Sequence, residues 1–187
     1  AYLEFAWGAQ RSGLYFTPIN WHLAPEEAAY IINDCGAKIL FCSHFIADLA
    51  EKLLPEIKGV QTKVMKGGTI PGYISYEDIL EKYPAEAVEP EIEGEFMYYS
   101  SGTTGWPKGI LRPLEKVPFG TPPDFVEVVK NAYGFGTDSI YLCPAPLYHS
   151  APIGWSMGTQ RLGGTVVLMD RFDAETALAL IEKYKVN

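Results

Sequence analysis

The chain has 187 residues and a formal net charge of −8 at pH 7, with 48% hydrophobic and 20% charged residues. This length allows one domain, or one and a half, with a real hydrophobic core, and the composition is ordinary for a globular protein. The acidic balance argues against a nucleic-acid partner or an acidic membrane surface, because both require a basic face, although a local basic site for a nucleotide is compatible with it.

The chain opens on segments that predict helices alternating with short apolar strands. Proline and two glutamates begin the second helix at Pro25, Ser43 and Ser75 are N-cap candidates, and Ser75 forms a capping-box-like pair with Asp78. In order, we expect a helix over 2–11, a strand over 14–17, a helix from 25 to the stop at Gly36, a strand over 38–42, a helix over 43–54, a strand over 60–65 and a short helix from 75 that ends before 84.

An acidic run containing proline and glycine then separates this first part from the rest. Glu86, Glu89, Glu91, Glu93 and Glu95 fall within ten residues, a composition typical of a solvated connector. We therefore predict a first α/β segment over 1–85, a connector over 86–94 and a second α/β segment over 95–187.

The second segment continues the same alternation. Gly134 is a C-terminal stop signal and Asp173 an N-cap candidate. We expect strands over 95–99, 109–112, 139–143 and 165–169, and helices over 124–133, from about 150 to 161, and over 174–184. Such alternation predicts α/β architecture with mostly parallel sheets flanked by helices, in which ligands bind at the carboxyl ends of strands.

The cysteines and the two chain ends indicate the setting. Cys35, Cys42 and Cys143 are odd in number and lack metal-ligand spacing, so we expect reduced, small hydrophobic residues in a cytoplasmic protein. The uncharged stretch between Asp138 and Arg161 is broken by prolines and is not expected to span a membrane. The chain begins without methionine inside a helix and ends directly after one, so we expect a piece of a longer protein.

The most informative stretch is Ser100-Ser101-Gly102-Thr103-Thr104-Gly105-Trp106-Pro107-Lys108-Gly109, between two predicted strands. Glycine permits close backbone approach to a ligand, and successive N–H groups form a nest for anions. Hydroxyls add donors and Lys108 adds a positive charge. A triphosphate fits this set best. The alternative is a solvated hairpin turn, which does not account for the lysine and the Pro-Lys-Gly ending.

A Walker A loop is a second alternative for this stretch. That motif requires G-x-x-x-x-G-K-[ST] and opens a helix. Counted from Gly102, the second glycine would fall on Pro107 and the Ser/Thr on Gly109, and the next residues favour a strand. An ordinary P-loop NTPase is therefore not expected, and a phosphate-binding hydrolase of another fold would need a helix directly after Lys108.

The same stretch resembles the signature loop of the adenylate-forming superfamily, which includes acyl-CoA synthetases, luciferases and peptide-synthetase adenylation domains. Gly13 to Pro18 with the Asn20 turn, and the helix from Pro25 followed by Ala37 to Phe41, also resemble that family. Pro146-Leu147-Tyr148-His149 is similar to its second motif. Arg112-Pro113 departs from the Thr-His pair found in many members, which leaves the acid undetermined.

The resemblance implies an incomplete N-terminal domain of an ATP-dependent acyl-CoA synthetase acting on a fatty acid or related carboxylate. ATP, Mg²⁺ and coenzyme A are the implied co-substrates and cofactor. The residues implied to bind phosphate are Ser100, Ser101, Gly102, Thr103, Thr104, Gly105 and Lys108, with the hydroxyl of Ser100 or of a neighbouring residue also touching Mg²⁺. His149 is the implied catalytic residue, beside the carboxylate and adenylate. The resemblance also implies an acid that binds ribose, a glutamate that shares Mg²⁺ and a catalytic lysine of a C-terminal domain in later parts of the protein, so we expect the piece alone to be inactive.

Tyr148, Trp155 and Met157 either line an acyl tunnel or pack a helix under the sheet. A non-catalytic nucleotide-binding or interaction module that retains the fold is the alternative function. The intact hydroxyl-rich loop and Lys108 speak against that alternative.

Overall fold

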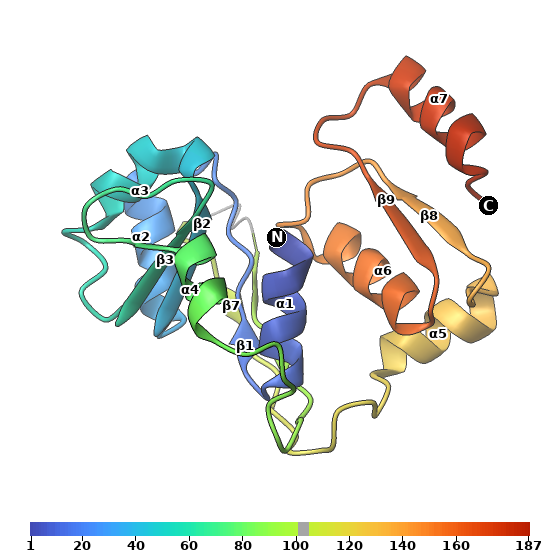
Figure 1. Cartoon of the computed structure of the whole chain (residues 1–187), viewed down its shortest axis with the longest axis horizontal. Coiled ribbons are helices and arrows are strands. Elements are labelled where there is room, and N and C mark those ends of the chain that lie inside the picture. Colours follow the sequence, from blue (N-terminus) through green and yellow to red (C-terminus); the bar gives the residue numbers. More distant parts are fainter. Residues whose placement is uncertain (101–104) are drawn as a thin grey trace. The chain divides into compact units, whose positions relative to one another are not determined.

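A computed structural model of the chain describes residues 1–100 and 105–187. Helices and strands follow in the order α1 Tyr2–Arg11, β1 Tyr15–Phe16, α2 Pro25–Asp34, β2 Ile39–Ser43, a 3₁₀ turn His44–Ile46, α3 Ala47–Leu53, β3 Thr62–Lys66, β4 Ile74–Ser75, α4 Tyr76–Lys82, β5 Glu95–Phe96, β6 Tyr98–Tyr99, β7 Gly109–Ile110, α5 Asp124–Tyr133, β8 Ile140–Cys143, α6 Ser150–Arg161, β9 Thr165–Leu168 and α7 Ala174–Tyr184 (Figure 1). They form two units: Ala1 with Leu3–Phe119, and Tyr2 with Gly120–Asn187.

The first unit is built on a three-stranded parallel sheet in the order β2-β3-β4. Ala28, Ala29 and Ile32 of α2 pack with Leu53 of α3 and with Ile57 in one buried cluster. In a second buried cluster, Ala50 of α3 packs against Met65 of β3 and Tyr73. The apolar face of α2 is thereby buried on α3, and α3 is buried on the sheet (Figure 1). This is the parallel α/β arrangement expected from the alternating pattern.

The side chains of the predicted N-cap residues accept hydrogen bonds from backbone N–H groups. The Ser75 hydroxyl accepts from the Asp78 N–H at 3.2 Å, and the Asp173 carboxylate accepts from the Thr176 N–H at 2.8 Å. Ser43 also caps, accepting from the Phe45 N–H at 3.2 Å, but its segment begins as the 3₁₀ turn before α3. Gly134 ends α5 with φ of 72°, the left-handed conformation that favours glycine.

The stretch 95–99, expected as one strand, divides into two strands that belong to different sheets. β5 pairs in parallel with β1, with Tyr15 opposite Glu95, whereas β6 pairs antiparallel with β7. Met97 lies between them and donates its N–H to the Phe16 carbonyl at 3.1 Å. The chain therefore leaves β1 after Met97 and takes a new partner. Which partner each half finds depends on segments far along the chain, so local sequence could not show the break.

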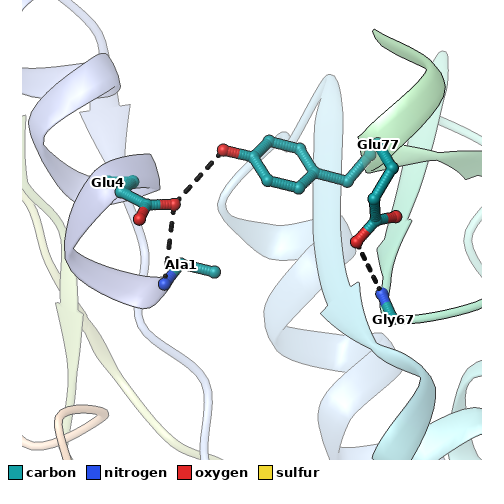
Figure 2. Close-up of polar contacts among 5 residues, drawn as sticks. Ala1, Glu4, Gly67 and Glu77 are labelled. Carbon is teal, nitrogen blue, oxygen red and sulfur yellow. Dashed lines mark hydrogen bonds and ion pairs between the residues drawn. The ribbon is translucent and has the colours of Figure 1, made fainter. Parts of the chain in front are cut away.

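Helix α1 packs beside the β2-β3-β4 sheet. The Phe5 ring stacks on Phe41 of β2 at 4.1 Å and meets the Tyr76 ring edge-on at 4.8 Å. The Tyr76 hydroxyl donates to the Glu4 carboxylate at 3.2 Å, and the same carboxylate pairs with the Ala1 amino group (Figure 2). Glu77 accepts from the Gly67 N–H at 3.0 Å, which ties the start of α4 to the end of β3 (Figure 2).

Gly8 in the interior of α1 offers a direct stability prediction. It is exposed, and no described atom lies within 4 Å of a Cβ added there. Gly8→Ala is expected to raise the free energy of unfolding by about 0.5–1 kcal/mol, because alanine restricts the unfolded chain and favours helix. The measurement is the urea midpoint. Gly36→Ala is the contrast: it also meets no described atom within 4 Å, but its φ of +66° strains alanine, so its midpoint should fall. A lower midpoint for Gly8→Ala would contradict this reading of α1.

The second unit is a βαβ unit with two added helices. β8 and β9 pair in parallel through the α6 crossover, and Ile140 lies opposite Thr165. Ile153 of α6 and Val129 of α5 are fully buried, so α5 and α6 pack together beside the strands (Figure 1). At the chain end, the Asn187 side chain accepts from the Ile140 N–H at 2.9 Å. Over the described part of the chain, no helix is both long and apolar enough to cross a bilayer.

The three cysteines are free thiols within the described structure. Cys143 is buried, and burial raises the pKa of the Cys42 thiol to about 12 and also raises the pKa of Cys35. Thiols with raised pKa values stay protonated and unreactive near neutral pH. These findings agree with the expected packing role.

Candidate functional site

The loop predicted to bind phosphate is framed by an antiparallel hairpin. Tyr98 lies opposite Ile110 and Tyr99 lies opposite Gly109. Directly after β6, Ser100 donates its N–H to the Lys108 carbonyl at 3.0 Å, and its hydroxyl lies 3.4 Å from the same oxygen. Ser100 and Lys108, the first and last of the predicted phosphate ligands, are thereby brought together at the mouth of the loop. Ser101, Gly102, Thr103 and Thr104 lie outside the described residues.

The residues after Lys108 form strand β7 and not a helix. A P-loop and a hydrolase with a helix directly after the lysine are therefore both excluded, as the Walker A comparison predicted. An antiparallel frame is shared by a phosphate loop and a solvated turn, so the choice between these two rests on side-chain chemistry and on family. Gly105, Trp106 and Lys108 are exposed, and the lysine ammonium is accessible to an anion.

Helix α2 contacts the loop on both sides of residues 101–104. The Tyr99 hydroxyl donates to the Asp34 carboxylate at 2.6 Å, and the Tyr30 ring lies 5.0 Å from the Trp106 ring, between centroids. Burial, and then the Asp34 hydrogen bond, raise the pKa of Tyr99, so the phenol stays protonated and donates. Tyr30 and Asp34 were not among the residues predicted from sequence to form the site. Their spacing of four residues on one helix face was a signal, but it pointed to no partner.

Gly109 lies close to two side chains where the loop returns to the sheet. A Cβ at this position would lie 2.6 Å from the Met97 methyl and 3.0 Å from Cζ of the Tyr99 ring. The ring that bonds to Asp34 therefore covers the glycine that ends the Pro-Lys-Gly sequence. Both neighbours are the outer ends of side chains, so glycine at position 109 leaves room for them where they lie.

His149, predicted as the catalytic residue, lies in the second unit at the N-cap of α6. Its N–H donates to the Pro146 carbonyl at 3.2 Å, and its own carbonyl accepts from the Ile153 N–H at 3.3 Å. The imidazole is exposed, lies 4.7 Å from the Tyr148 ring, and makes no cap hydrogen bond with the described first turn of the helix. The turn thus fixes the backbone of His149 and leaves its ring accessible; its catalytic role stays a prediction.

The aromatic residues suggested for an acyl tunnel have packing partners. Trp155 meets Phe125 and Tyr133 edge-on, with ring centroids 5.5 and 4.9 Å apart, and Met157 is buried. These contacts favour the core-packing alternative for Trp155 and Met157.

No group of three or more histidine, cysteine, aspartate or glutamate side chains among the described residues is arranged to hold a metal ion. Mg²⁺ prefers oxygen ligands and is often bound through substrate phosphates with few protein groups. The Ser100 hydroxyl is an exposed oxygen at the loop mouth, so the chemistry of this donor fits a magnesium ion carried by a triphosphate and does not fit a free-standing metal site.

The chain matches known proteins along its whole length. Residues 1–187 match the family model described as AMP-binding enzyme. The long-chain-fatty-acid–CoA ligase FadD13 of Mycobacterium tuberculosis is 29% identical over 96% of this chain and 35% of its own length. The indoleacetate–CoA ligase of Aromatoleum aromaticum is 30% identical over 95% of this chain and 34% of its own length. The chain thus spans about a third of the curated relatives it matches.

A solved structure supports the fold independently. A crystal structure from Rhodopseudomonas palustris, described as a long-chain-fatty-acid CoA ligase, superposes with a TM-score of 0.79 at 22% identity, over 95% of this chain and 44% of that chain. At this identity the likeness concerns the fold alone. Since the family model matches every residue and the hairpin carries the expected glycine- and hydroxyl-rich loop, the chain belongs to the AMP-binding enzyme family.

Proposed function

We propose that this chain forms part of an ATP-dependent acyl-CoA synthetase and that its β6–β7 loop holds the ATP phosphates. The observation that carries the proposal is the closure of this loop by the Ser100–Lys108 backbone hydrogen bond within a chain that matches the AMP-binding family over its full length. Both relatives named above are carboxylate–CoA ligases by name, which supports the same reaction class.

The proposed reaction has two steps. In the first, a carboxylate oxygen attacks the α-phosphorus of ATP, and the bond to the bridging oxygen breaks to release pyrophosphate and leave an acyl-adenylate. In the second, the sulfur of coenzyme A attacks the acyl carbon, and AMP leaves with the former carboxylate oxygen on its phosphate. The acid is a fatty acid or a related carboxylate.

In this proposal the loop stabilises charge and does not act as a nucleophile. Lys108 neutralises phosphate charge as pyrophosphate forms, and Ser100 and Gly105 contribute from the two flanks of the loop. Ser101, Gly102, Thr103 and Thr104 would add N–H groups and hydroxyls. Donors placed in advance where charge develops lower the barrier without reorganising during the reaction.

Two further groups have roles in the proposed site. The Ser100 hydroxyl would contact Mg²⁺, whose chemistry is to neutralise phosphate oxygens and orient the triphosphate. His149 would lie beside the carboxylate and adenylate and line or gate the acyl pocket. Its exposed ring on a fixed helix N-cap supports an accessible position.

We also propose a domain organisation for the chain and a cellular location for the protein. Residues 86–94 would connect an α/β segment over 1–85 to the loop-bearing segment over 95–187. The three free thiols support a cytoplasmic setting. Because the chain spans about a third of its relatives, we expect it to lack adenylation activity without the remainder of the protein.

The test is pyrophosphate release by the full-length protein with Mg-ATP and a panel of straight-chain, aromatic and short hydroxylated carboxylates. Release that depends on one class of acid supports the proposal and names the class. No acid-dependent release, together with tight Mg-ATP binding, would overturn it in favour of a non-catalytic nucleotide-binding module. Activity of residues 1–187 alone at the full-length rate would contradict the requirement for the remaining parts.

A further inference from the structure

The end of helix α2 presents two side chains to the phosphate loop. Tyr30 and Asp34 are four residues apart and therefore lie on one face of the helix. Asp34 accepts the Tyr99 hydroxyl at 2.6 Å, just before Ser100, and Tyr30 contacts the Trp106 ring at 5.0 Å, two residues before Lys108. One helix face thus holds the entrance and the exit of the loop.

Helix α2 is itself fixed in the core of the first unit. Ala28, Ala29, Ile31 and Ile32 are buried, and three of them pack against α3 in one cluster. Asn33, beside Asp34, donates its side-chain N–H to the Glu56 carbonyl at 3.0 Å. The Tyr30 and Asp34 contacts therefore connect the hairpin to a helix whose opposite side is packed in the core.

The Tyr99 ring carries this connection to the end of the loop. It covers Gly109, where an added Cβ would lie 3.0 Å from the ring, and its hydroxyl reaches Asp34. Tyr99 also belongs to β6, whose partner in the ladder is Gly109. The Tyr99 side chain therefore lies against both strands that close the loop and also reaches α2.

We propose that Tyr30 and Asp34 are positioning residues that hold the two described flanks of the phosphate loop in place for ATP binding, through Trp106 on one side and Tyr99 on the other. This inference rests on the proposed function of the loop. A loop held in advance in its binding conformation loses less conformational freedom when ligand binds, and a loop that is only partly in that conformation binds with reduced apparent affinity. The expected signature is a change in ATP binding without a change in handling of the acid.

Removing the charge of Asp34 distinguishes a positioning role from a direct electrostatic effect on ATP. A carboxylate repels a nearby triphosphate. If this repulsion were the main effect of Asp34, removal of the charge in Asp34→Asn would tighten ATP binding. If Asp34 acts as the acceptor for Tyr99, asparagine retains an acceptor oxygen and should preserve function, whereas alanine should not.

The experiment measures KM for ATP, kcat and KM for the acid in the full-length protein, with the Kd of Mg-ATP determined calorimetrically. Tyr99→Phe and Asp34→Ala are each expected to raise KM and Kd for ATP by about three- to tenfold, with kcat and the acid KM within twofold. For Asp34→Asn, KM and Kd for ATP should stay near the wild-type values. For Tyr30→Leu, both should rise, as for Asp34→Ala. The Tyr99→Phe/Asp34→Ala double variant should bind ATP no more weakly than the weaker-binding single variant, because both substitutions remove the same hydrogen bond.

Tyr76→Phe is the matched control. It removes the same kind of tyrosine–carboxylate bond, from the Tyr76 hydroxyl to Glu4 at 3.2 Å, in the same unit but between α4 and α1, which are not part of the hairpin or of α2. It is expected to leave ATP binding unchanged. Equal loss of thermal stability in Tyr76→Phe and Tyr99→Phe with no change in ATP affinity, or equal effects on ATP and acid, would reduce Asp34 to a structural role and overturn the proposal.

The outcomes also separate this inference from the proposed function. Suppose that no acid supports pyrophosphate release, but that Mg-ATP binds and Tyr99→Phe weakens this binding. The synthetase assignment then fails while the positioning role stands. If pyrophosphate is released and every α2 variant keeps wild-type ATP affinity, the positioning role fails alone. If wild type neither binds nor turns over Mg-ATP, both are overturned.

Discussion

Lys108→Ala in the full-length protein is expected to lower kcat/KM for ATP by about 10²-fold, the magnitude typical of removing one preorganised charge-stabilising donor. Lys108 lies at the closing end of the loop, where its carbonyl bonds to Ser100 and its side chain is exposed. Because the backbone bond does not depend on the side chain, alanine should remove the charge while leaving the hairpin closed. The measurement is steady-state pyrophosphate release as a function of ATP.

Two variants make the Lys108 result specific. Lys116→Ala removes a charge from an exposed lysine of the same unit that lies outside the hairpin, and it should retain wild-type kinetics. Lys108→Arg should recover part of the loss, since it restores charge with a different shape. Equal kinetics for Lys108→Ala and Lys116→Ala would show that Lys108 binds no phosphate and would favour the solvated-turn alternative.

Gly94→Ala is expected to have the largest effect on stability. A Cβ at Gly94 would lie 2.5 Å from the Leu14 carbonyl oxygen, 2.7 Å from the Ala9 carbonyl oxygen and 2.9 Å from the Gln10 Cα. All three atoms are backbone, so no side-chain rotation relieves the clash. The Gly94 N–H also donates to the Gln10 carbonyl at 2.7 Å. We expect a loss of about 3 kcal/mol in the free energy of unfolding, at the upper end of overpacking effects.

Gly59→Ala is the control for Gly94. It lies in the same unit, is exposed, and no described atom falls within 4 Å of an added Cβ, so its unfolding midpoint should stay close to wild type. Urea unfolding of both variants gives the comparison. A Gly94→Ala midpoint equal to that of Gly59→Ala would mean that the chain just before β5 does not approach the backbone of Ala9, Gln10 and Leu14 as closely as the structure shows.

Elements with local signals were predictable from sequence. Asp173, Ser75 and Gly134 act through hydrogen bonds or backbone conformations that involve residues within a few positions, so their patterns identify helix ends. The division between β5 and β6 was not predictable in this way. It depends on pairing with β1 and β7, and a strand sequence does not specify which distant segment becomes its partner.

The ligand chemistry of the candidate site was predictable from sequence, but the long-range contacts that hold the hairpin in place were not. The lysine, glycines and hydroxyls of the loop lie within ten residues, and their types indicate an anion ligand. The Tyr99–Asp34 bond joins residues 65 positions apart, and the Tyr15 hydroxyl donates to the Arg112 carbonyl across 97 positions at 2.6 Å. Contacts of this kind follow from the fold, and no local pattern contains them.

The most direct test of adenylate formation follows an oxygen atom. The full-length protein is incubated with Mg-ATP, coenzyme A and a supporting acid labelled with ¹⁸O in its carboxylate, and the nucleotide product is analysed by mass spectrometry. Attack on the α-phosphorus followed by thioester formation predicts AMP that carries one ¹⁸O atom, together with unlabelled pyrophosphate. ADP with labelled inorganic phosphate would show attack on the γ-phosphorus and would contradict the account.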